Sequence, residues 1–85
     1  MHMDRAIFDL QASVEATSLY ILICAIMDQN ELPTLIRARV QWNGNGDALL
    51  SATRELMRRG VLEEMNPLSE EEPLRLNPKT KWGFF

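Results

Sequence analysis

The chain has 85 residues and a net charge of −3, with 46% hydrophobic and 25% charged residues. This length allows one domain with a single hydrophobic core, and the composition is typical of a folded chain. The acidic balance argues against general affinity for nucleic acids. A single cysteine excludes an internal disulfide, and no Cys/His spacing typical of a metal site is present.

The sequence contains no motif of a catalytic centre. Its one histidine, His2, lies beside Met1, where a cloning remnant is an alternative to a native start. There is no nucleophile elbow and no phosphate-binding loop, so we expect neither an enzyme nor a cofactor. The apolar run 19–27 is far shorter than the roughly 20 residues that span a bilayer. It predicts a buried helix with Cys24 inside, in a cytoplasmic protein without a membrane partner.

Residues 4–29 are predicted to be helical, because apolar side chains recur at steps of three and four without glycine or proline. Hydroxyl residues near the middle are candidate internal caps. One long helix and two helices joined near residues 13–18 both fit this pattern. The run "DQNELP" then ends the segment, because asparagine and proline are poor in helix interiors.

Two further helices follow. Thr34 is placed to cap a short helix over 35–42, and "NGNG" at 43–46 predicts a turn, because glycine and asparagine tolerate positive φ. Asp47 is expected to cap a third helix over 48–59. This helix has a narrow apolar stripe at helical spacing, formed by Leu49, Ala52, Thr53 and Leu56.

The pattern changes at Gly60, which is expected to end the third helix in the left-handed conformation. Residues 61–65 and 74–77 predict two short strands that pair as a hairpin across the loop 66–73. The last segment, 78–85, is basic and aromatic.

This order of elements resembles a winged helix-turn-helix domain of the kind found in MarR-type bacterial regulators. The resemblance covers residues 18–77, about two thirds of the chain. Its most specific part is the end of the recognition helix and the start of the first wing strand, which Leu56, Arg58, Arg59, Gly60, Val61 and Leu62 match. The Gly-rich turn and a glutamate-rich wing loop depart from the family pattern.

The resemblance implies a mostly α fold with a small β-hairpin: a three-helix core, a two-stranded wing and an extra N-terminal helix. The chain then divides into an N-terminal helical extension (1–17), the winged domain (18–77) and an aromatic tail (78–85). It also implies a bacterial transcriptional regulator that binds double-stranded DNA as a homodimer, with the third helix in the major groove.

The charge distribution agrees with a DNA-binding third helix. Residues 37–59 hold five arginines against Asp47 and Glu55, whereas the segments on both sides are acidic. The candidate contacts are Asn45, Ser51 and Arg54 at base edges, and Arg37, Arg39 and Arg58 at phosphates. The alternative is that these arginines form only a solvated helix face.

Two other features favour a protein-interaction module with little DNA affinity. Leu50 and Met57 lie off the apolar stripe of the third helix, where they would suit a protein partner better than DNA. The glutamates at 63–64 and 70–72 would repel phosphate if the wing lay along a duplex. This module is the alternative function.

The terminal segments add a candidate interface. An apolar N-terminal helix favours dimerisation, although packing on its own core is the alternative. The aromatic tail is expected to cover the core or the dimer contact. The residues expected at a dimer or partner interface are Ile7, Phe8, Leu10, Leu50, Met57, Trp82, Phe84 and Phe85. Trp42 is expected in the core.

Overall fold

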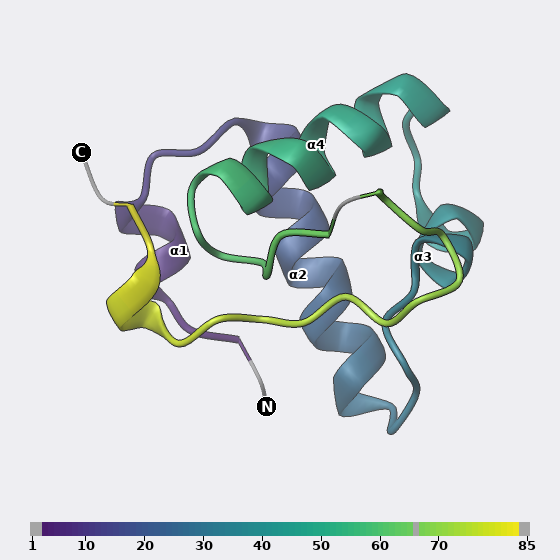
Figure 1. Cartoon of the computed structure of the whole chain (residues 1–85), viewed down its shortest axis with the longest axis horizontal. Coiled ribbons are helices and arrows are strands. Elements are labelled where there is room, and N and C mark those ends of the chain that lie inside the picture. Colours follow the sequence, from purple (N-terminus) through teal and green to yellow (C-terminus); the bar gives the residue numbers. More distant parts are fainter. Residues whose placement is uncertain (1–2, 66, 84–85) are drawn as a thin grey trace.

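The computed structural model describes residues 3–65 and 67–83 (Figure 1). The described residues form α1 (Ala6–Asp9), α2 (Val14–Asp28), α3 (Leu35–Gln41), α4 (Gly46–Arg58) and a 3-10 helix (Lys79–Lys81). The central helix is α2, which contacts α1, α3 and α4. In Figure 1, α4 crosses the upper half of α2, and α3 is seen nearly along its own axis. The core therefore lies around the inner side of α2.

The N-terminal segment forms two helices, one of the two alternatives that the sequence allows. Gln11 adopts a left-handed conformation with φ of 58° between them. The Ser13 hydroxyl then accepts a hydrogen bond of 3.1 Å from the backbone N–H of Ala16 and caps α2. Ile7 and Leu10 are buried in the core that α2 helps to form. The N-terminal helix thus packs on its own chain.

The caps of the next two helices differ in how well they were predicted. The Thr34 hydroxyl accepts from the backbone N–H of Arg37 at 3.1 Å, as expected. The expectation that Asp47 caps α4 is wrong. Asn45 has extended backbone angles, and its side chain accepts from the N–H of Ala48 at 2.7 Å. The helix therefore begins at Gly46, and Asp47 lies in its first turn.

The Gly-rich turn is explained by the indole of Trp42. The indole N–H donates to the carbonyl of Asn45 at 3.2 Å, and a Cβ on Gly44 would lie 2.7 Å from that nitrogen. Among the described glycines only Gly60 has positive φ, so the expected reason for the glycines is wrong. Gly44 is required by close approach of a ring, and Trp42 itself is partly buried against the core.

The end of α4 is as predicted. Gly60 has φ of +80°, its N–H donates to the carbonyl of Met57 at 3.1 Å, and the N–H of Val61 donates to the carbonyl of Leu56 at 2.9 Å. This pair of bonds is a Schellman motif, which needs a residue with positive φ. Val61 and Leu62 are then buried in the core.

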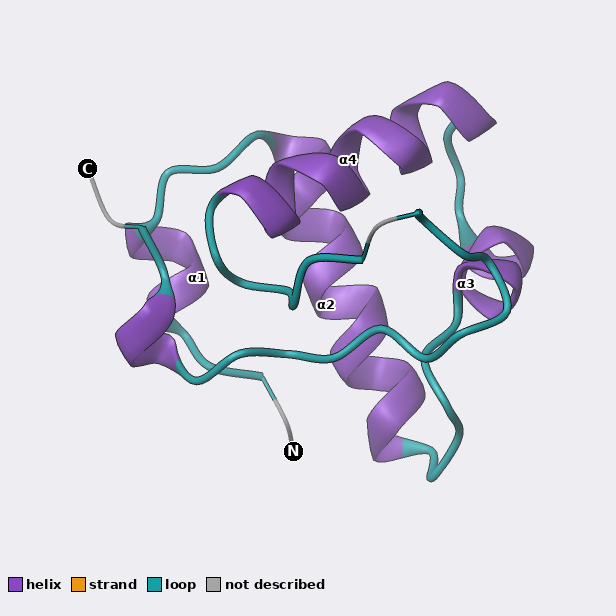
Figure 2. Ribbon diagram, in the orientation of Figure 1, coloured by secondary structure: helices purple, strands orange, loops and turns teal. Residues whose placement is uncertain are grey.

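The two-stranded wing, by contrast, is not seen. Figure 2 shows no strand in the part of the chain that the structure describes. The segments after Gly60 run antiparallel and share one isolated bridge, between Leu62 and Leu76. Two hydrogen bonds of 2.8 Å flank the bridge, from Glu63 N–H to the Arg75 carbonyl and from Asn77 N–H to the Val61 carbonyl. The winged fold is therefore corrected to a mostly helical one.

The hairpin stops where the next ladder donor would be Pro73, and its second segment bonds on its other side to the start of α3. The N–H of Leu74 donates to the carbonyl of Pro33 at 2.8 Å, and the carbonyl of Glu70 accepts from the N–H of Ile36 at 3.3 Å. Pro73 has no N–H to donate. The loop is thus attached to the start of α3 and cannot extend a ladder with residues 63–65.

The C-terminal segment returns to the N-terminal one. Trp82 is buried, lies edge-on to Tyr20 with 5.5 Å between ring centroids, and donates its indole N–H to the Asn77 carbonyl. Arg59 donates to the carbonyls of Gly83 and Leu10 at 3.2 and 2.5 Å. These contacts join both terminal segments to the end of α4.

Candidate nucleic-acid interface

The outward surface of α4 is a single polar row. The inner side of the helix carries the predicted apolar stripe, and all four of its residues are buried. On the opposite side, steps of four, three and four residues expose the outer row of α4, which consists of Asp47, Ser51, Arg54 and Arg58. The helix is therefore held from one side and offers charged groups on the other.

Three of the six predicted DNA contacts lie together in this row. Ser51, Arg54 and Arg58 are all exposed on one face of α4. Arg54 and Arg58 are one helical turn apart, so their guanidinium groups can reach neighbouring acceptors on one ligand. This pair is the part of the predicted site that the structure brings together.

Arg37 and Arg39 of α3 are already engaged in ion pairs. Nη1 of Arg37 lies 2.7 Å from a Glu31 carboxylate oxygen, and Nη2 of Arg39 pairs with Glu70. Both pairs are about half exposed, so each contributes little to stability and can open. Their predicted role at phosphates requires that a phosphate replaces a carboxylate.

Asn45 is less suited to its predicted base contact. Its side-chain oxygen is the cap of α4, accepting from the N–H of Ala48. Asparagine reads adenine with its oxygen and nitrogen together. A base contact would therefore cost α4 its cap.

Leu50 and Met57 do not lie in the outer row. Both are partly buried, and Met57 packs against the core beside Met65 and Leu68. These three residues line a hollow of about 520 Å³, together with Arg54, Arg58 and Glu64. Of the two apolar residues that argued for a protein partner on α4, Met57 is thus turned toward the chain itself, and Leu50 is partly covered.

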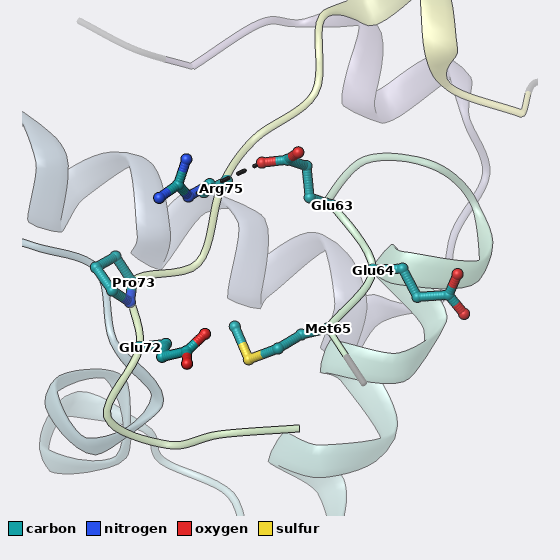
Figure 3. A pocket seen from close by; sticks show the side chains of 6 residues that line it. All are labelled: Glu63, Glu64, Met65, Glu72, Pro73 and Arg75. Atoms are coloured by element: carbon teal, nitrogen blue, oxygen red, sulfur yellow. Dashed lines mark ion pairs between the residues drawn. The ribbon is translucent and has the colours of Figure 1, made fainter. Parts of the chain in front are cut away.

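Glu64, in the first segment after Gly60, lies beside the second half of α4, whereas Glu70 of the loop pairs with Arg39 of α3. Figure 3 shows a hollow of about 290 Å³ between the two antiparallel segments, lined by Glu63, Glu64, Met65, Glu72, Pro73 and Arg75. Glu63 faces Arg75, with Oε2 4.0 Å from Nε, whereas Glu64 points away from the other five residues. Glu64 also lines the hollow next to Arg54 and Arg58. Negative charge therefore limits how a polyanion can approach this end of the helix.

Glu55 fixes the orientation of α4 relative to α2. Its two carboxylate oxygens accept from the backbone N–H and the hydroxyl of Ser13, at 2.8 and 2.7 Å. Burial raises the pKa of Glu55, but the Ser13 hydrogen bonds and the nearby Arg58 and Arg59 outweigh it and leave the pKa below its usual value. The charged carboxylate joins the cap of α2 to the middle of α4.

Two buried titratable groups lie away from this row. Burial raises the pKa of Tyr20 to about 12, and the Tyr20 hydroxyl accepts from the N–H of Asp4 at 2.8 Å. Cys24 is buried and free, as predicted, and burial also raises its pKa. Within residues 3–65 and 67–83, no group of three or more His, Cys, Asp or Glu side chains could hold a metal ion.

The residues expected at a dimer or partner interface differ in their exposure to solvent. Ile7, Leu10 and Trp82 are buried in the core of their own chain, which is the alternative to an intermolecular contact. Phe8 remains 56% exposed on α1. Phe84 and Phe85 lie outside the described residues.

Other exposed apolar residues were missed by the sequence reading. Val14 and Ile21 of α2, and Ile36 and Val40 of α3, all have exposed side chains. The signal that could have found Ile21 is the absence of any charged residue over 16–27. A helix that is apolar on every side has more apolar surface than one small core can cover.

Comparisons with protein-family models, curated proteins and solved structures found no match to this chain. Of the helices described here, none has both the length and the apolar character needed to cross a membrane. The proposals below therefore rest on the geometry and charge of this chain alone.

Proposed function

We propose that the chain is a DNA-binding protein, a bacterial transcriptional regulator that contacts duplex DNA through the outer row of α4. The observation that supports this is the exposed pair Arg54 and Arg58, with Ser51 in line, on a helix fixed from its inner side. The proposal includes a cytoplasmic location and no catalysis.

The dimensions and chemistry of α4 suit the major groove. A helix is about 10–12 Å across, and the groove is about 12 Å wide. Arginine donates two parallel hydrogen bonds to guanine or neutralises a phosphate, and a serine hydroxyl can donate or accept. Arg54 and Ser51 would meet base edges, and Arg58 would hold a phosphate.

Negative charge near the outer row limits the expected affinity for DNA. Glu64 beside the arginine pair and the net charge of −3 both oppose a polyanion. In non-specific binding both Arg54 and Arg58 would hold phosphates, and two phosphate contacts per copy predict a slope of about −2 in log K against log salt. We therefore expect non-specific binding on the order of 10⁻⁴ M at low salt.

The test is fluorescence anisotropy of a labelled random-sequence duplex, titrated with the protein at low and then moderate salt. Binding should appear at low salt and weaken at moderate salt. The variant R54A/R58A should lose at least about tenfold in affinity, because two guanidinium contacts are removed.

The matched control is K79A/K81A. Both double variants remove two positive charges, but Lys79 and Lys81 are exposed on the 3-10 helix and not on α4. If this control loses as much affinity as R54A/R58A, the effect is one of net charge and not of the outer row. Absence of binding at low salt would contradict the proposal. The protein-interaction module would then be the remaining hypothesis for the function.

A further inference from the structure

Beyond its first turn, the outer side of α2 lacks the charged residues expected of a surface helix. Residues 16–27 contain no charged side chain, and the inner side is filled by core residues such as Leu19, Ile23 and Ile26. The opposite side is nevertheless open to solvent, with Val14 79% exposed and Ile21 39% exposed. A helix that is apolar all round is normally buried on all sides.

The open side of α2 continues onto α3. A groove of about 510 Å³ is lined by Val14, Ser18 and Leu22 of α2, and by Gln41 and Trp42 at the end of α3. A second hollow of about 270 Å³ also includes Gln41 and extends to Ile36 and Val40. We name this surface the α2–α3 face, which comprises Val14, Ser18, Ile21, Leu22, Ala25, Ile36, Val40, Gln41 and Trp42.

Charged residues of opposite sign lie at the two ends of the α2–α3 face. Glu15 borders the groove at the start of α2, and Arg37 borders the second hollow on α3. In the described contacts, Arg37 uses Nη1 for Glu31, and a guanidinium carries five N–H donors. A twofold axis near Gln41 would bring Glu15 of each copy toward Arg37 of the other.

We infer that the α2–α3 face is the contact surface for a second copy of this chain, in a symmetric dimer. A twofold contact needs a surface complementary to itself. An uncharged centre with one acidic and one basic end meets that requirement. Ser18 and Ala25 are small, so two α2 helices can approach closely across the axis.

The area required is within reach of this surface. A standard interface buries about 800 Å² on each partner, and the exposed surface of the chain is 5441 Å². The face spans α2, about 22 Å long at 1.5 Å per residue, and the adjoining α3. Val40, 82% exposed, and Val14 are the side chains that gain most from being covered.

This inference does not rest on DNA binding. The outer row of α4 points away from the inner stripe of that helix, whereas the groove of the α2–α3 face is bordered by Ala48 of α4 and by its N-cap Asn45, neither of which belongs to the outer row. The two surfaces can therefore be changed separately. Mass and DNA affinity are separate measurements, so either proposal can fail alone.

The experiment is sedimentation equilibrium of the whole chain over a range of micromolar concentrations. The expected result is a species of twice the chain mass of 9.8 kDa. V14E and I21E should each weaken dimerisation by about 100-fold, because each buries an unpaired carboxylate. Val14 is exposed in the first turn of α2, where an acidic residue is tolerated, so V14E keeps the test valid if I21E fails to fold.

The matched control is F8E, which places the same charge on an exposed apolar residue of α1. It should leave the dimer unchanged. Swapping the end charges gives a second test: E15R and R37E should each weaken the dimer, and E15R/R37E should restore it.

A monomer at every concentration would overturn the inference. So would a dimer that survives V14E and I21E, or one that F8E dissociates, because the contact would then lie on another surface. Failure of the charge swap to restore the dimer would overturn the twofold arrangement about Gln41.

Discussion

The outer sides of α2 and α4 differ, although the two helices pack on each other through similar inner sides. The inner side of α4 presents Leu49 and Leu56 to the core, and the inner side of α2 presents Ile23. Outward, α4 exposes charged residues that water solvates well, whereas α2 exposes only uncharged side chains between Glu15 and Asp28. One surface suits a polyanion and the other an apolar partner, so a chain of this size can carry two independent contact surfaces.

The difference arises from the sequence pattern of each helix. In α4, apolar residues occupy one stripe and polar residues the rest. Burial of that stripe therefore covers most of the apolar surface of the helix. In α2, apolar residues are found all round, and the single chain covers only part of them. The helix in the centre of the fold is therefore also the one that remains incompletely covered.

The largest expected effect comes from breaking the end of α4 with G60A. An alanine there would hold φ of +80°, and its Cβ would lie 2.3 Å from the carbonyl oxygen of Lys81. Strain and the backbone clash together should cost more than about 3 kcal/mol of unfolding free energy. Urea denaturation followed by circular dichroism measures the loss.

The control for this change is G46A. Gly46 begins α4 and has no neighbouring atom within 4 Å of an added Cβ. Alanine should be neutral there or stabilise the helix by up to about 1 kcal/mol. Equal losses in the two variants would show that the left-handed turn is not what holds the end of α4.

The two sides of α2 can be compared with I23A and I21A. Ile23 is fully buried, so its truncation should cost about 2–4 kcal/mol of unfolding free energy. Ile21 is 39% exposed, and its truncation should cost less than about 1 kcal/mol at concentrations where the chain is monomeric. Urea titrations of dilute protein measure both values. Similar losses would mean that Ile21 is covered within one chain.

The smallest effect is expected from E55Q, which weakens the link between α4 and the start of α2. Because the pKa of Glu55 is lowered on folding, the carboxylate stabilises the fold above the usual carboxyl pKa. That contribution is lost as the pH falls toward the lowered value. E55Q should therefore cost about 1 kcal/mol at neutral pH and nothing at acidic pH.

Unfolding free energies of the wild type and E55Q across this pH range measure the difference. E63Q is a matched control, because Glu63 is exposed and has only a distant partner, Arg75 at 4.0 Å. A difference between wild type and E55Q that is constant with pH would contradict the role of the Glu55 charge.

Much of the helical framework follows from local signals. Thr34 and Gly60 were assigned correctly because a hydroxyl cap and a left-handed glycine act within a few residues. The buried stripe of α4 was assigned because its spacing follows the helical period. Val61 and Leu62, which the resemblance places at the start of the first wing strand, are buried in the core.

The errors involve partners that are distant in sequence. The N–H of Leu74 donates to the carbonyl of Pro33, and nothing near Leu74 in the sequence indicates this attachment. The role of Gly44 depends on where the Trp42 ring folds back. The ion pair of Arg39 with Glu70, 31 positions away, was likewise not indicated by the sequence, and the phosphate contact of Arg39 stays a prediction.

For this protein the sequence alone determined the start of α3 at Thr34, the end of α4 at Gly60, the buried stripe of α4 and the apolar character of α2, since each depends on spacing and short-range hydrogen bonds. Only the tertiary structure decided which side of α2 is covered, which arginines are ion-paired and how the segment after Gly60 is attached. Those outcomes depend on surfaces that meet after the chain has closed on itself. A single chain of this size can cover one side of α2, and packing selects which side it is.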